Sequence, residues 1–314
     1  MQEREQGAQE QDELLFLVGP TATGKTDLGV ELARAHGLEV CSLDSMLVYR
    51  GMDIGTAKPT EAERGGVPHH LIDLVDPPER YDVQRFREDA LAAARGIADR
   101  GSRALFVGGT GLYLQVLVHG LFDGPAIDRA LRARLEERGR VEGGEVLYRE
   151  LMAVDPTLAR RLHPNDARRV IRGLEVFEQT GTPLSTLQSQ WASGAPRPAR
   201  IVGLDPEREA WEAKVRARTD AMLAAGWIDE VRAIVDGPGF GPTSRQALGY
   251  AEILAHLAGE LERDALPELV ARRTRQFARR QRTWYRRFDD IAWMPHDLEG
   301  IARVAWAATR LGLA

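Results

Sequence analysis

The sequence predicts an α/β protein with a doubly wound parallel sheet and a helical insertion. Short apolar runs alternate with amphipathic stretches from residue 14 to about residue 120, and a further apolar run begins at residue 201. This alternation is typical of parallel strands joined by crossover helices. Between residues 128 and 190 the alternation stops and only helical patterns remain. With 43% hydrophobic and 28% charged residues, the composition is that of a globular protein.

The first predicted strand, residues 14–18, leads into a glycine-rich loop and a helix over residues 27–36. The loop matches the pattern G-x-x-x-x-G-K-[ST], so the core is expected to be P-loop NTPase-like. In such a loop the backbone amides and the helix N-terminus bind phosphate groups. Lys25 is expected to reach the outer phosphate, and Thr26 is the predicted Mg²⁺ ligand. The predicted phosphate-binding residues are Gly19, Pro20, Thr21, Ala22, Thr23, Gly24, Lys25 and Thr26.

The remaining elements follow in chain order. We predict strands over residues 38–43, 104–107, 201–204 and 291–294, and helices over residues 82–100, from residue 112, and over residues 128–138, 144–154, 166–179, 207–236 and 267–288. Residues 14–127 and 198–314 form the predicted core domain, and residues 128–197 form the helical insertion domain. The polar residues 1–13 are expected to be a flexible tail.

Two polar residues follow predicted strands, where ligands of open α/β sheets gather. Asp44 comes after the second strand and Thr110 after the third. Asp44 fits three roles: a Mg²⁺ ligand, a general base, or the N-cap of the next segment. The third strand leads into Gly108 and Gly109, whereas a hydrolytic P-loop ATPase usually carries an acid there. The sequence therefore does not indicate a hydrolytic motor.

Two further patterns are less specific. Arg245 follows the Gly/Pro-rich loop 237–242, and a mobile loop with one arginine is a common clamp for a transferring phosphate. An exposed arginine in a flexible loop is the alternative interpretation. His69, His70 and Asp73 suggest a metal site, but adjacent side chains point apart in a strand or a helix, so we do not expect one.

The charge is unevenly distributed. The net charge is −5, yet residues 271–288 hold eight arginines and no acid. Their spacing places a basic stripe along the predicted helix, formed by Arg272, Arg275, Arg279, Arg282 and Arg286. Because like charges at this spacing repel, the stripe favours a nucleic-acid partner over a solvated face. Arg168, Arg169 and Arg172 add positive charge on the outer side of an insertion helix.

Other classes of protein are excluded by simple counts. No apolar run approaches the ~18 residues of a membrane span, and the N-terminus does not resemble a secretory signal. The lone Cys41 rules out an internal disulfide. We therefore expect a cytoplasmic protein that does not associate with a membrane, and nothing in the sequence indicates an obligate dimer, so a monomer is expected.

Taken together and in this order, several motifs resemble those of the bacterial tRNA dimethylallyltransferases, also called tRNA isopentenyltransferases. The resemblance extends from Leu14 to Arg287. It rests on residues 19–26, Asp44-Ser45, residues 49–59 (YRGMDIGTAKP), residues 108–113 (GGTGLY), residues 163–166 (HPND), residues 245–250 (RQALGY), and residues 274–276 (TRQ) with 280–284 (RQRTW). This chain has Leu47 where many members carry Gln. Because leucine has no polar side-chain atom, the resemblance implies no polar side-chain contact at this position.

The resemblance implies a reaction and a role for each matched residue. The family transfers a dimethylallyl group from dimethylallyl diphosphate to N6 of the adenosine 3′ to the tRNA anticodon. The P-loop then holds the diphosphate with Mg²⁺ at Thr26, Asp44 acts as base, and Arg245 and Thr110 complete the catalytic set. The resemblance implies tRNA contacts at Asp44, Ser45, Met46, Leu47, Thr110, Arg132, Arg168, Arg169, Arg172, Ser244, Arg245, Gln246, Gly249, Arg279, Arg282 and Arg286.

Two other functions share part of this pattern. A small-molecule P-loop kinase has the same strand-loop-helix and a substrate-binding Asp after the second strand, but needs no acid-free arginine helix. A nucleotide-regulated RNA-binding protein without catalysis does not depend on Asp44. Transfer of label from dimethylallyl diphosphate or from ATP to RNA distinguishes the three.

Overall fold

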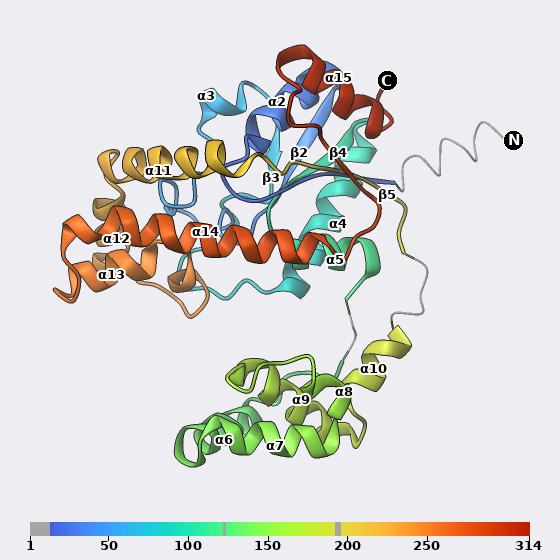
Figure 1. Ribbon diagram of the computed structural model, residues 1–314. Coiled ribbons are helices and arrows are strands. Elements are labelled where there is room, and N and C mark those ends of the chain that lie inside the picture. Colours follow the sequence, from blue (N-terminus) through green and yellow to red (C-terminus); the bar gives the residue numbers. More distant parts are fainter. Residues whose placement is uncertain (1–12, 122–123, 192–195) are drawn as a thin grey trace, which may run out of the picture. The chain divides into compact units, whose positions relative to one another are not determined.

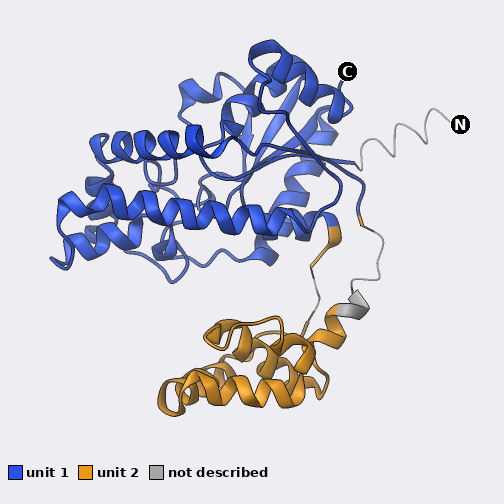
Figure 2. Ribbon diagram, in the orientation of Figure 1, with its two compact units in different colours: residues 1–118, 197–314 blue, residues 119–196 orange. Residues whose placement is uncertain are grey.

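The computed structural model describes residues 13–121, 124–191 and 196–314. The chain divides into two compact units, residues 1–118 with 197–314 and residues 119–196 (Figure 2). The second unit overlaps the predicted insertion, residues 128–197, except at residue 197, which belongs to the first unit. The predicted flexible tail, residues 1–13, lies outside the described residues except for Glu13.

The first unit is built on a parallel sheet with the strand order β3-β2-β4-β1-β5-β6 (Figure 1). The strands are β1 (Leu14–Val18), β2 (Leu38–Leu43), β3 (His69–His70), β4 (Arg103–Gly108), β5 (Ala199–Gly203) and β6 (Ile291–Trp293). Each neighbouring pair is parallel, which confirms the predicted α/β class. β1 is wholly buried near the centre of the sheet, as its unbroken apolar sequence requires.

Helices cover both faces of this sheet (Figure 1). Successive β1 side chains point to opposite faces, so Leu15 and Leu17 pack on one side with α2 (Lys25–His36) and α15 (Gly300–Arg310). Phe16 points to the other side and stacks on Phe106, with ring centroids 5.3 Å apart. The helices α4 (Val83–Asp99) and α5 (Gly111–His119) are joined by a stacked pair, Phe86 and Tyr113.

The edge strand β3 was not predicted, and it explains the histidine pair. His69 and His70 pair with Val40 and Cys41 of β2. The His70 Nε2 lies 2.6 Å from a Glu39 carboxylate oxygen that also accepts a 2.7 Å hydrogen bond from Arg100. Among the described residues no group of three or more His, Cys, Asp or Glu could hold a metal ion. The histidines therefore belong to the sheet edge.

Four helices pack beyond the carboxyl ends of the strands: α11 (Arg208–Ala224), α12 (Trp227–Asp236), α13 (Tyr250–Leu257) and α14 (Leu266–Tyr285). The prediction of one helix over residues 207–236 was wrong. Gly226 adopts a left-handed conformation with φ of +97° and separates α11 from α12. In Figure 1, α11 and α14 lie side by side and run in opposite directions away from and back to the sheet.

A turn over residues 53–58 is fixed by charges on two sides. The Glu230 carboxylate accepts hydrogen bonds from the backbone N–H groups of Asp53, Ile54 and Gly55 at 2.8, 2.6 and 3.2 Å, and from the Tyr250 hydroxyl at 2.6 Å. The buried Lys58 ammonium donates to the carboxylates of Asp53 and Asp73 at 2.6 and 2.5 Å and to the Tyr49 carbonyl at 2.8 Å. This turn is thereby tied to α12 and α13.

The described part of the second unit contains helices joined by loops and no strand. It contains α6 (Arg129–Glu142), α7 (Gly144–Val154), α8 (Pro156–Ala159), α9 (Ala167–Thr180) and α10 (Leu184–Trp191). The carboxylates of Asp128 and Asp166 cap α6 and α9 at their N-termini. Leu135, Leu151 and Leu174 belong to its own buried core, as expected for a compact insertion. None of the described helices has both the length and the apolarity that crossing a membrane requires.

Candidate active site

The predicted P-loop lies between β1 and α2, in the expected strand-loop-helix geometry. Gly19 and Gly24 have φ of +152° and +77°, and a Cβ on Gly19 would lie 2.3 Å from the Leu204 carbonyl oxygen. Position 19 therefore accommodates only a glycine. The Lys25 ammonium donates to the Pro20 carbonyl at 2.5 Å and contacts the Thr23 hydroxyl at 3.3 Å. Lys25 is therefore held by its own loop.

Side chains from distant helices brace this loop. Gln281 of α14 accepts a 3.0 Å hydrogen bond from the Thr21 N–H and donates a 2.8 Å bond to the Gly109 carbonyl. Trp211 of α11 donates its indole N–H to the Thr21 carbonyl at 2.8 Å. The sequence alone gave no sign of these bridges. They fix the loop relative to the ends of α11 and α14.

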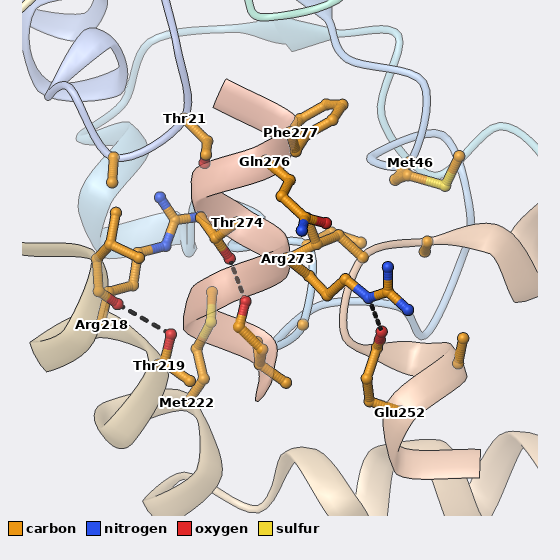
Figure 3. A pocket seen from close by; sticks show the side chains of 18 of the residues that line it. Thr21, Met46, Arg218, Thr219, Met222, Glu252, Arg273, Thr274, Gln276 and Phe277 are labelled. Atoms are coloured by element: carbon orange, nitrogen blue, oxygen red, sulfur yellow. Dashed lines mark hydrogen bonds and ion pairs between the residues drawn. The ribbon is translucent and has the colours of Figure 1, made fainter. Parts of the chain in front are cut away.

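A cavity of about 320 Å³ opens beside the P-loop, between the strand ends and the four helices. Figure 3 shows side chains from α11 and α14 meeting across it. Its polar residues include Thr21, Asp44, Ser45, Thr110, Arg218 and Gln246, and its apolar residues include Val215, Met222, Trp227, Leu248, Val270 and Phe277. Anionic and apolar parts of one substrate can therefore be bound in the same space.

Asp44 lies in this cavity directly after β2. Its carboxylate accepts a 2.8 Å hydrogen bond from the Met46 N–H. Burial raises the pKa of Asp44, while the Met46 N–H and the Lys25 charge act in the opposite direction. A buried carboxylate with only partial compensation is a suitable proton acceptor. The capping interpretation also holds locally, because the Met46 bond is an Asx-type turn.

Arg218 is a charged cavity residue that the sequence patterns did not indicate. It extends from α11, and Figure 3 shows its guanidinium directed toward Thr21 of the P-loop. Burial lowers the pKa of Arg218, whereas the Asp44 charge raises it. Its spacing is the one sequence signal that could have identified it. Arg218 follows the buried Val215 by three residues and precedes the cavity residue Met222 by four, so the three side chains share one face of the helix.

Burial and the nearby Arg218 charge lower the pKa of Lys25 to about 7, and the Asp44 charge opposes this shift. The two cations therefore repel each other across the phosphate loop. A bound anion would relieve this repulsion by supplying negative charge. The cluster of Lys25, Arg218 and Asp44 is arranged for an anionic ligand next to a base.

The structure does not bring Arg245 to the cavity. Arg245 is exposed on the short helix η1 (Ser244–Gln246) and does not line the cavity, whereas its neighbours Gln246 and Ala247 do. The buried Ser244 hydroxyl sets this orientation by donating to the Pro77 carbonyl at 2.6 Å. Ser244 and Gly249 are both buried, and their burial is at odds with the expected direct contact with RNA.

The other residues from the sequence analysis are found in different settings. Ser45, Met46 and Thr110 line the cavity, whereas Leu47 does not. On α14, Arg279 and Arg286 are exposed, but Arg282 pairs with Asp205 at 2.6 Å and lies over Trp211. The stripe is thus less uniform than its sequence suggested, because Asp205 pairs with Arg282 and Glu268, in the first turn of α14, pairs with Arg275 at 2.8 Å.

In the second unit, Arg168 and Arg169 are exposed. Arg132 and Arg172 instead pair with Glu175, whose side chain is fully buried, at 2.5 and 3.0 Å. A buried carboxylate requires such partners. These two arginines therefore also hold α6 against α9.

The residues present fit a Mg²⁺ ion only as a companion of a phosphate ligand. Thr26 is exposed in the first turn of α2, next to the phosphate loop. The described chain offers no carboxylate cluster beside it. Mg²⁺ accepts this arrangement, since it usually keeps water and takes few protein ligands in addition to phosphate oxygens.

The raised pKa of Asp44 gives a testable pH dependence. A base must be deprotonated to accept a proton, so kcat/KM is expected to fall as the pH decreases through the pKa of the free enzyme's Asp44. Because burial raises this pKa above the ordinary 3.8, the acidic limb should lie at a higher pH than that of a free aspartate. A pH–rate profile, with circular dichroism at each pH as the folding control, measures it. A flat profile down to pH 4 would contradict this assignment.

Comparisons with known proteins identify the family of this chain. The family model described as IPP transferase matches residues 47–288, and the model described as isopentenyl transferase matches residues 12–73. The tRNA dimethylallyltransferase of Geobacter metallireducens is 46% identical over 292 residues, covering 92% of this chain and 94% of the relative. That of Desulforudis audaxviator is 46% identical over 284 residues, covering 90% and 91%.

Solved structures give the same result. The full-length tRNA isopentenylpyrophosphate transferase of Bacillus halodurans is 37% identical with a TM-score of 0.70, covering 96% of this chain and 97% of that one. A eukaryotic dimethylallyltransferase, solved acting on tRNA, is 30% identical with a TM-score of 0.77, covering 90% and 73%. The P-loop, the cavity and these similarities lead to one conclusion: this chain belongs to the IPP transferase family.

Proposed function

We propose that this protein is a tRNA dimethylallyltransferase, which transfers the dimethylallyl group of dimethylallyl diphosphate to N6 of the adenosine 3′ to the anticodon. One observation carries the proposal: the Asp44 carboxylate shares an apolar-walled cavity with Thr21 and Ala22 of the P-loop and with Arg218. A phosphate cradle, a base and apolar walls in one space suit an allylic diphosphate and a nucleobase.

In this mechanism the N6 nitrogen forms a bond to C1 of the dimethylallyl group as the bond from C1 to the diphosphate oxygen breaks. The N6 amine is a weak nucleophile because its lone pair is delocalised into the ring. Asp44 accepts the N6 proton, and the diphosphate leaves with the electron pair of the broken bond. Lys25, Arg218 and the backbone N–H groups of the P-loop stabilise the charge that grows on the leaving group.

Mg²⁺ is part of the proposal, with Thr26 as its protein ligand. When bound, the ion neutralises phosphate charge. The chain's own residues bind and orient the diphosphate, and Asp44 takes the proton.

The target base must leave its stack in the anticodon loop before it can enter the cavity. The free-energy cost of this unstacking is lowest for unpaired loop bases. The exposed Arg279 and Arg286 of α14 and Arg168 and Arg169 of the second unit supply positive charge for the RNA backbone. We also propose that the protein acts as a monomer, and a tRNA substrate is consistent with a cytoplasmic location.

A labelled donor tests the proposal. The protein is incubated with unmodified tRNA and either labelled dimethylallyl diphosphate or γ-labelled ATP. We expect label in the RNA from the prenyl donor only. A small-molecule kinase would turn over ATP, and a non-catalytic RNA-binding protein would transfer nothing, so either outcome would refute prenyl transfer.

A further inference from the structure

We propose that Arg273, positioned by Glu252, binds a phosphodiester of the RNA strand that enters the cavity. The inference rests on the proposed function, because it states how RNA is held at the same site. Arg273 is not among the arginines that the sequence pattern selected, and only the tertiary structure distinguishes it from its neighbours.

The arginines of α14 fall on different faces of the helix. The cavity-lining residues of α14 are linked by intervals of three and four residues, which place them on one side of the helix: Val270, Arg273, Thr274, Gln276, Phe277 and Arg280. Arg272, Arg279 and Arg286 repeat every seven residues on another face and do not line it. The helix thus presents one arginine row to the cavity and another to the surrounding surface.

Glu252 fixes the position of Arg273 at the cavity wall. One Glu252 oxygen accepts a 3.1 Å hydrogen bond from the Arg273 Nε, and the other accepts a 3.1 Å bond from the Gly249 N–H at the start of α13. The Glu252 side chain is 11% exposed and that of Arg273 is 53% exposed. The acid is therefore anchored inside while the guanidinium reaches solvent.

Glu252 engages only one donor of Arg273, and Figure 3 shows this contact through Nε. Within the described part of the chain, the two terminal nitrogens make no hydrogen bond. These terminal donors form a fork that matches two phosphate oxygens. An ion pair this exposed adds little to stability, so stability alone does not account for the arrangement.

The neighbouring side chains suit an RNA strand as well. Phe277, one turn along the same face, offers a ring on which a base can stack, and Arg280 lies over that ring at 5.6 Å. Arg273 and Phe277 thus present a phosphate contact and a stacking surface side by side. In a nucleotide strand, phosphates likewise alternate with bases, so the two contacts match neighbouring parts of one strand.

The test compares Arg273→Ala with Arg232→Ala, two similarly exposed arginines that each pair with a carboxylate, of which only Arg273 lines the cavity. Dissociation constants for an anticodon stem-loop RNA are measured over a range of salt concentrations, without prenyl donor. We expect R273A to weaken binding roughly five- to tenfold and to reduce the slope of log K against log salt by about one, and R232A to change either value much less. Arg273→Lys should retain most of the slope, because it keeps the charge, yet bind more weakly, because it loses the fork.

Steady-state kinetics separate a binding role from a merely structural one. For R273A the KM for RNA should rise while the KM for dimethylallyl diphosphate stays unchanged. Equal losses in R273A and R232A would overturn the inference, as would an R273A that binds RNA normally. A fall in melting temperature with unchanged RNA binding would assign Arg273 to the α13–α14 contact alone. Failure of the proposed function is distinct, because the unaltered protein would then transfer no prenyl group.

Discussion

Replacing Asp44 with Asn is expected to reduce kcat for prenyl transfer by about 10²- to 10⁴-fold, the usual contribution of a general base. Asparagine has nearly the same shape, and its carbonyl oxygen can still accept the 2.8 Å hydrogen bond from the Met46 N–H. The local turn is therefore preserved, and only proton acceptance is lost. Single-turnover transfer of labelled dimethylallyl groups to tRNA measures the effect.

This variant separates catalysis from the capping role that the sequence left open. Binding of tRNA by D44N should stay close to that of the unaltered protein, and so should its melting temperature. Asp76→Asn is the matched control, since Asp76 is an exposed carboxylate paired with Arg50 outside the cavity. If the rate of prenyl transfer by D44N is within a few-fold of that of the unaltered protein, Asp44 stabilises the local turn and is not the catalytic base.

Arg218→Gln is expected to lower kcat by roughly 10²- to 10³-fold, the loss typical of removing one preorganised donor from developing negative charge. Arg218 is directed toward the P-loop from a largely buried position, where its charge is weakly screened. The leaving diphosphate carries more charge in the transition state than in the ground state. The loss should therefore affect kcat more than the KM for dimethylallyl diphosphate.

The pH profile gives R218Q a second, independent readout. The Arg218 charge lowers the pKa of Asp44, so its removal should raise that pKa and shift the acidic limb of kcat/KM to higher pH. Arg216→Gln is the matched control, because Arg216 lies two residues earlier on α11 and pairs with Glu268 at the surface. If R216Q and R218Q lose the same activity, the cavity role of Arg218 is refuted.

The sequence was sufficient for features that depend on neighbouring residues. The apolar runs indicated β1, β2, β4, β5 and β6, because strands of a parallel sheet covered by helices are largely apolar. The P-loop was recognisable because phosphate binding needs glycines, a lysine and a helix N-terminus at fixed spacing. Asp44 and Thr110 were identified by their positions at strand ends, which converge at one edge of a parallel sheet.

The tertiary structure decided what depends on residues far apart in the chain. Arg218 and Arg273 belong to the cavity because α11 and α14 pack against each other there, and no local pattern encodes that pairing. The same packing brings Arg282 into an ion pair with Asp205. The buried Ser244 hydroxyl donates to the Pro77 carbonyl, and the neighbouring Arg245 is exposed. Sequence spacing says which residues share a helix face, but only the packed partner determines whether that face meets solvent, an acid or the substrate.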